Sequence, residues 1–102
     1  MSLEDQIGPN EKVEWEGPKV SHNDKDYKVY ITNERLILHK ERGFISKTDD
    51  LVAWDLKEIE QIQYKGGWRS GVVTIEVGGK EETVEPSEEG PNLTAKVRAR
   101  IS

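Results

Sequence analysis

The chain has 102 residues and a mass of 11.6 kDa, with 34% charged residues and a net charge of −5. A chain of this length holds one hydrophobic core, so we expect a single domain. It contains no cysteine, which excludes disulfide frameworks, thiolate metal sites and cysteine nucleophiles. Neither half of the chain is basic, and the sequence therefore predicts no nucleic-acid binding and only weak attraction to anionic membranes.

The first ten residues show no hydrophobic periodicity and no signal-peptide pattern. We predict that residues 1–10 form a flexible tail and that residues 11–102 form the one domain. No apolar run in the sequence is long enough to span a membrane. The expected location is the cytoplasm.

Alternation of apolar and polar residues predicts a chain of short strands. Residues 17–26 are rich in turn formers and are expected to be a loop, whereas Asn33-Glu34 and Gly78-Gly79 are expected to be two-residue hairpin turns. The expected strands lie at 12–17, 26–32, 35–40, 51–55, 71–77 and 80–85, with a short extended segment at 44–47. The three-residue spacing of Leu56, Ile59 and Ile62 predicts a single helical turn that leads into a further strand ending at Tyr64.

Only the end of the chain has a helical pattern. Pro91 suits the first position of a helix, and Leu93, Val97 and Ile101 then recur every four residues as one apolar stripe. So narrow a stripe indicates a helix that packs on the sheet or covers one end of a barrel. The predicted core consists of Val13, Trp15, Val29, Ile31, Leu36, Leu38, Leu56, Ile59, Ile62, Val73, Ile75, Val77, Leu93 and Val97.

Three segments resemble the prokaryotic pleckstrin-homology (PH) domains and the related GRAM domains. Residues 27–38, YKVYITNERLIL, resemble their Y-x-(V/L)-T-N-x-R-L hairpin; residues 54–62, WDLKEIEQI, resemble their I-P-L-x-x-I-x-x-V segment; and residues 71–85 resemble their closing hairpin. The resemblance covers roughly residues 11–101. It implies a mainly β fold: a PH-like barrel of about seven antiparallel strands, capped by one C-terminal α-helix.

The two histidines offer little chemistry. His22 lies near Asp24 and Asp26, but the segment lacks the number of ligands and the glycine of a calcium loop, so we expect it to be a solvated turn. His39 is expected to be exposed on a strand. Since no nucleophile is placed with a base and no carboxylates are paired, the sequence predicts no enzyme, no catalytic residue, no metal and no cofactor.

Lysines near the first predicted hairpin suggest an anion site. In eukaryotic PH domains the first hairpin loop carries Lys and Arg residues that bind inositol phosphates, and this resemblance implies a candidate lipid- or anion-binding set of Lys19, Lys25, Lys28, Arg42 and Lys47. Asp24 and Asp26 lie among them and weaken the basic motif. The alternative interpretation is solvated surface charge.

Trp68 lies in a loop between Lys65 and Arg69. An exposed Trp beside cations can enter a membrane interface or anchor a partner, so these three residues are candidate partner-binding residues. Alternatively, Trp68 folds back and covers the barrel. The helix supplies two more candidates, Lys96 and Arg100, which flank the apolar stripe and would form the basic rim of a groove that suits an acidic or amphipathic peptide and not a basic one. Alternatively, Lys96, Arg98 and Arg100 only neutralise the C-terminal end of the helix and keep the surface soluble.

Two functions remain open at this stage. The first is a non-catalytic protein-interaction or self-assembly module, in which a sheet edge or the groove beside the helix takes an unidentified protein or peptide. An open sheet edge could equally pair with a second copy, so we expect at least a weak homo-oligomer. The second is peripheral membrane or lipid-headgroup binding through the Trp68 loop, which the net charge of −5 disfavours.

Overall fold

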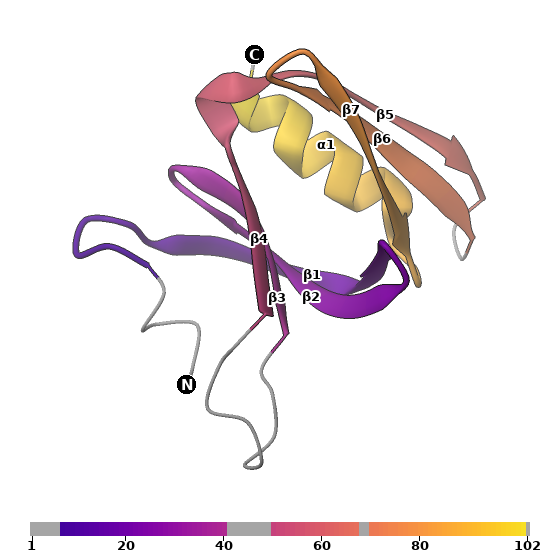
Figure 1. Ribbon diagram of the computed structural model, residues 1–102, viewed down its shortest axis with the longest axis horizontal. Helices are drawn as coiled ribbons and strands as arrows, with labels where there is room; N and C mark the ends of the chain where they lie inside the picture. Colours follow the sequence, from indigo (N-terminus) through magenta and orange to yellow (C-terminus); the bar gives the residue numbers. More distant parts are fainter. Residues whose placement is uncertain (1–6, 41–49, 68–69, 102) are drawn as a thin grey trace.

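The computed structural model describes residues 7–40, 50–67 and 70–101 (Figure 1). Regular structure accounts for most of this part of the chain. Its elements are β1 (Val13–His22), β2 (Lys25–Thr32), β3 (Arg35–Lys40), β4 (Asp50–Asp55), the short 3-10 helix η2 (Leu56–Glu58), β5 (Ile59–Gly66), β6 (Gly71–Val77), β7 (Lys80–Pro86) and α1 (Gly90–Ile101).

All neighbouring strands are antiparallel, and their order in the sheet is β4-β3-β2-β1-β7-β6-β5. The sheet bends into two halves, β1–β4 and β5–β7, which face each other with α1 between them (Figure 1). β1 joins the halves through two residue pairs with β7, Val20 with Pro86 and Ser21 with Glu85. The predicted fold class, seven antiparallel strands with one C-terminal helix, is confirmed.

β1 extends well beyond the strand predicted at 12–17. β1 continues to His22 because its pairing with β2 shifts register twice, between Val13 and Trp15 and between Glu16 and Lys19, and resumes after each shift. Pro18 lies in the second shift, where a strand tolerates a residue without an N–H group. The loop predicted at 17–26 is therefore wrong, and the chain reverses at Asn23-Asp24 alone, where both φ angles are positive at 51° and 65°.

The core fills the space between the two halves and α1. Most of the predicted core residues are buried, but Val13 is 37% exposed and Trp15 and Val77 are only half-buried against the core. The predicted core omitted Val20, Tyr27 and Val84. The full cluster is Val20, Tyr27, Val29, Ile31, Leu36, Leu38, Leu56, Ile59, Ile62, Val73, Ile75, Val84, Leu93 and Val97.

α1 begins at Gly90, one residue before the predicted start, and lies against β5, β6 and η2. Leu93 and Val97 are buried and Ile101 is half-buried against the core, so the predicted apolar stripe is confirmed. A glycine is required at position 90 because the ring of Tyr64 occupies the space of a Cβ atom. This close approach brings the helix directly onto β5.

Candidate binding surfaces

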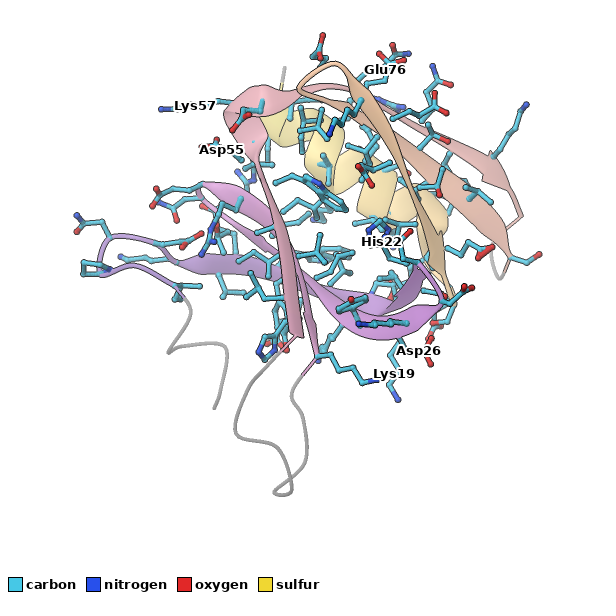
Figure 2. The ribbon with its side chains drawn as sticks, in the orientation of Figure 1. Lys19, His22, Asp26, Asp55, Lys57 and Glu76 are labelled. Carbon is cyan, nitrogen blue, oxygen red and sulfur yellow. The ribbon has the colours of Figure 1, made fainter. Side chains whose placement is uncertain are left out.

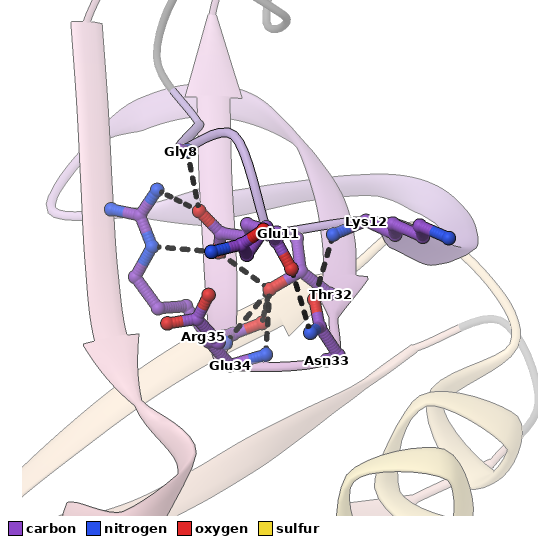
Figure 3. A network of polar contacts seen from close by, with 8 residues as sticks. Gly8, Glu11, Lys12, Thr32, Asn33, Glu34 and Arg35 are labelled. Carbon is purple, nitrogen blue, oxygen red and sulfur yellow. Dashed lines mark hydrogen bonds and ion pairs between the residues drawn. The ribbon is translucent and has the colours of Figure 1, made fainter.

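A buried ion pair holds the segment before β1 against the β2–β3 turn (Figure 3). Arg35 donates to the Glu11 carboxylate from Nε at 2.9 Å and from Nη2 at 2.8 Å, and the Thr32 hydroxyl donates to the same carboxylate at 2.6 Å. Glu11 is only 7% exposed and Thr32 is fully buried. We call Glu11, Thr32, Asn33 and Arg35 the clasp.

Asn33 completes the clasp through main-chain groups. Its Oδ1 accepts a hydrogen bond from the Lys12 N–H at 2.7 Å, and its Nδ2 donates to the Asn10 carbonyl at 3.2 Å. The Gly8 N–H also donates to Glu11. The Thr-Asn-Glu-Arg turn that carries the sequence resemblance therefore has a structural role, because it fixes the chain between Gly8 and Lys12.

The clasp also sets the protonation of Glu11. The hydrogen bonds from Arg35 lower the pKa of Glu11 from 4.5 to about 2; burial opposes this change, while the Thr32 hydroxyl and the Gly8 N–H add to it. Glu11 in turn raises the pKa of Arg35. Because both carboxylate oxygens already accept hydrogen bonds, Glu11 is a structural anion and a poor candidate for a general base.

Three lysines line one hollow on the β1–β2 side of the molecule. Lys19 and Lys28 are cross-strand neighbours, and Lys40 from the end of β3 joins them around a volume of about 320 Å3. Asp26 lines the same hollow, close to Lys19 (Figure 2). Lys28 is also 3.2 Å from a Glu16 carboxylate oxygen, so acidic groups offset part of the positive charge.

The other three predicted anion-binding residues are not among the described residues that line this hollow. Lys25 is exposed at the first position of β2, where its register partner is His22. Arg42 and Lys47 lie outside the described residues. The structure therefore brings together Lys19 and Lys28 from the predicted set and adds Lys40, which sequence reasoning did not include.

Two cations of α1, Arg98 and Arg100, have partners on the barrel. Arg100 Nη2 lies 2.8 Å from a Glu14 carboxylate oxygen on β1, and Arg98 Nη2 donates to the Ile62 carbonyl on β5 at 2.9 Å. Lys96 is exposed. Of the two residues predicted to form a basic rim, Arg100 is thus tied to an acid, which reduces the positive charge available to a ligand.

A cleft of about 360 Å3 lies where the end of α1 approaches η2 and the β2–β3 turn. Its apolar lining comes from Leu56, Ile59 and Ile101. Its polar lining has both signs of charge, so the cleft does not select an anion by charge alone. The polar residues are Asn33, Glu34, Asp55, Lys57 and Arg100.

The predicted tryptophan site is only partly described. Trp68 and Arg69 lie outside the described residues, and Lys65 is exposed near the end of β5. Gly67 and Ser70, on either side, are joined by a main-chain hydrogen bond of 2.8 Å. The Tyr64 hydroxyl donates to the carbonyls of both. The base of this hairpin is therefore fixed.

His22 is buried, contrary to the prediction of a solvated turn. It lies between β4 and β7 (Figure 2), where Nδ1 is 2.7 Å from the Thr83 carbonyl and Nε2 is 3.9 Å from a Glu82 carboxylate oxygen. The ring meets Trp54 edge-on at 5.5 Å. The prediction failed because β1 continues into the space between the sheet halves.

His39 is buried as well, and its predicted exposure is wrong. It lies on β3, an internal strand, with its ring 6.3 Å from that of Tyr30. Its register partners are Lys28 on β2 and Leu51 on β4. Among residues 7–40, 50–67 and 70–101, no three His, Asp or Glu side chains form a group suited to a metal ion.

Among the described residues, the strands of the barrel do not close on one side. β4 and β5 are the end strands of the sheet order, and within the described part of the chain they are not paired with each other. Figure 1 shows β4 running down from η2 in front of the ribbons of the other strands of its half, with α1 to one side of it. We call the edges of β4 and β5 the open side.

Comparison with known proteins shows which fold and which family this architecture belongs to. The fold is that of a PH-like domain: it is similar to the pleckstrin homology domain from Shewanella amazonensis SB2B, with a TM-score of 0.62, 18% sequence identity, and coverage of 97% of this chain and 91% of that one. The family model for the bacterial PH domain matches residues 7–98, and the chain belongs to that family. A comparison with curated proteins gives no match.

The described segments contain no helix that is both long and apolar enough to cross a membrane. The family resemblance predicted from the sequence is thus confirmed at the level of the PH-like fold, whereas the similarity to GRAM domains stays a prediction.

Proposed function

We propose that this bacterial PH domain is a non-catalytic interaction module that binds an extended protein segment at its open side. The observation that carries the proposal is the unpaired state of the two end strands, β4 and β5, within the described residues. Strand edges present free N–H and C=O groups, which a partner segment can pair with. In this proposal the protein acts in the cytoplasm.

The groups that catalysis would need have structural partners here. Glu11 is held by Arg35 and Thr32, and His22 is bonded to the Thr83 carbonyl. These contacts support a binding function over an enzymatic one.

Selection from a random peptide library on the immobilised full chain tests this function. Selected peptides should move the amide signals of residues 50–67 or of α1 in an NMR titration. Lys96→Glu should weaken peptides that dock beside α1, and Lys80→Glu, which reverses another exposed lysine charge, is the matched control. Failure to select any peptide would overturn the proposal, as would signal changes confined to the β1–β2 side.

The lysine hollow favours a second candidate, binding to anionic headgroups. Lys19, Lys28 and Lys40 surround it, and Lys65, Trp68 and Arg69 at the β5–β6 hairpin could add membrane contact. Sedimentation with anionic vesicles tests this reading. Binding should fall in Lys19→Glu/Lys28→Glu and in Trp68→Ala, and a protein that never sediments with such vesicles contradicts it.

Self-assembly would use the same open side. Light scattering of the full chain at increasing concentration measures it, and the expected weak homo-oligomer requires a mass that rises above 11.6 kDa. A constant monomer mass at high concentration would contradict it.

A further inference from the structure

We propose that the β4 edge, and not the β5 edge, receives the partner, and that the partner is an extended segment with alternate apolar residues and a Lys or Arg opposite Asp55. This inference rests on the proposed interaction function and specifies its edge and its ligand class. Three observations carry it: the direction of the main-chain groups of β4, the blocked edge of β5, and the charges around Asp55.

Main-chain geometry identifies the free groups of β4. In its register with β3, Leu36 pairs with Trp54 and Leu38 with Val52. Beyond the strand end, the Leu56 N–H donates to the Glu34 carbonyl at 2.9 Å, which marks that pair as hydrogen-bonded. Hydrogen-bonded pairs recur at every second residue in an antiparallel ladder, so Val52 and Trp54 point their main-chain groups toward β3.

Leu51, Ala53 and Asp55 therefore direct their N–H and C=O groups to the opposite edge. Within the described residues, this edge makes no main-chain hydrogen bond to another strand. The side chains from Leu51 to Trp54 are all apolar and all half-buried. An apolar strand with one unpaired edge is a template for a further strand.

The edge of β5 is different. The Ile62 carbonyl already accepts a hydrogen bond from Arg98, and α1 packs directly against β5. An incoming strand would have to displace this side chain before it could pair with Ile62. β4 has no such obstacle in the described part of the chain, so it is the more accessible edge.

The charges near β4 select a cationic segment. Asp55 is exposed at the end of β4, where its partner on β3, Arg35, offsets part of its charge. On the core side of β4, the buried His22 contacts Trp54 and lies 3.9 Å from the Glu82 carboxylate of β7. With a net charge of −5, the whole molecule also attracts cations. β3 itself shows the complementary pattern, an apolar strand with basic ends.

A second copy of β4 matches this edge less well. The outward-directed residues must pair with one another, so an antiparallel pair centred on Ala53 places Asp55 opposite Leu51 of the copy. Each copy then places one carboxylate beside an apolar residue of the other copy, and the cation beside that carboxylate is its own Arg35 on β3. A segment with Arg or Lys at that position adds an opposite charge on the outer edge of β4.

A synthetic copy of residues 35–40, RLILHK with blocked ends, is a suitable probe because β4 already accepts this sequence on its other edge. In an NMR titration of the full chain, the amides of Leu51, Ala53 and Asp55 should shift most. A control peptide with Glu in place of the terminal Arg and Lys should bind at least about tenfold more weakly.

Ala53→Pro removes an outward N–H without removing a bond to β3, and it should weaken the peptide roughly fivefold or more. Ala53→Ser keeps the N–H and should bind normally. Should Ala53→Pro not fold, Asp55→Asn is the second variant: it keeps the hydrogen bond from the Lys57 N–H but removes the charge, and it too should weaken binding.

The outcomes separate the two levels of the proposal. Signal changes at β5 or α1 would overturn the assignment of the edge while leaving the interaction function intact. Equal binding of the acidic peptide would overturn the cationic ligand class. Chain dimers that form through β4 in preference to the peptide would make a second copy the occupant, and no binding of the probe would overturn the inference.

Discussion

At the scale of single residues, Glu11 makes the stability of this domain depend on acidity. Its carboxylate has a pKa of about 2 in the folded chain and an ordinary value of 4.5. When a carboxyl group has a lower pKa in the folded chain than in the unfolded chain, its ionisation stabilises the fold at any pH above the unfolded-state pKa. This stabilisation is lost as the pH falls from the unfolded-state pKa to the folded-state pKa. The contribution at neutral pH is about 3 kcal/mol.

We therefore expect the free energy of unfolding to decrease between about pH 5 and pH 2. Glu11→Gln should lower stability at pH 7 and flatten this part of the curve, because the titrating group is gone. Urea unfolding at a series of pH values measures both effects. Glu16→Gln, which removes an exposed carboxylate, is the control and should leave the slope unchanged.

The role of the clasp could not be predicted from the sequence. The resemblance singled out the Thr-Asn-Glu-Arg turn, but Glu11 lies 24 positions before Arg35, in a segment without periodicity. Only the folded chain shows that a residue so close to the expected tail is buried. For the same reason, the burial of His22 and His39 depends on neighbours that sequence spacing does not reveal.

At the scale of elements, two hairpins offer a matched comparison. The β1–β2 turn uses Asn23-Asp24 with φ angles of 51° and 65°, and the β6–β7 turn uses Gly78-Gly79 with 58° and 80°. Such turns favour glycine, because other residues rarely adopt positive φ. The two connections have the same length but different conformational costs.

Asp24→Gly should stabilise the chain by up to about 1 kcal/mol, and Gly79→Asp should destabilise it by a similar amount. At Gly79 the effect is one of backbone conformation, since a Cβ there meets no other atom within 4 Å. Thermal melts of both variants test this. A lower melting temperature for Asp24→Gly would contradict the expected cost of Asp24 in the turn.

Regular alternation made most strands predictable, and irregular pairing accounts for the main error. The segments 26–32, 35–40, 71–77 and 80–85 each closely match an observed strand. The second half of β1 was assigned to a loop because its Gly-Pro pair is typical of turns. A register shift can absorb such a pair inside a strand, but no sequence pattern marks where a shift occurs.

At the scale of the whole molecule, the seven-stranded, helix-capped architecture was predictable because the strand patterns and the apolar helix stripe agree on it. The candidate binding surfaces were less predictable from the sequence. Sequence reasoning grouped Lys19 with Lys28, but it could not detect that Arg100 contacts Glu14 or that Arg98 reaches β5. Long cations have many possible partners, and only the packed arrangement selects among them.

The narrow junction between β1 and β7 has a consequence for the order of folding. All other strand pairs join neighbours along the chain, whereas this one joins Val20 to Pro86. Contacts between distant positions carry a larger loop-closure cost, so the junction should form after the transition state, when the local hairpins already exist. Val20 also pairs with Tyr27 in the β1–β2 hairpin, so Val20→Ala should accelerate unfolding more than it slows folding. Val73→Ala, which is similarly buried within the β5–β7 meander, should mainly slow folding. Stopped-flow measurements over a range of denaturant concentrations separate the two rates, and comparable slowing of folding by both variants would place closure of the barrel before the barrier.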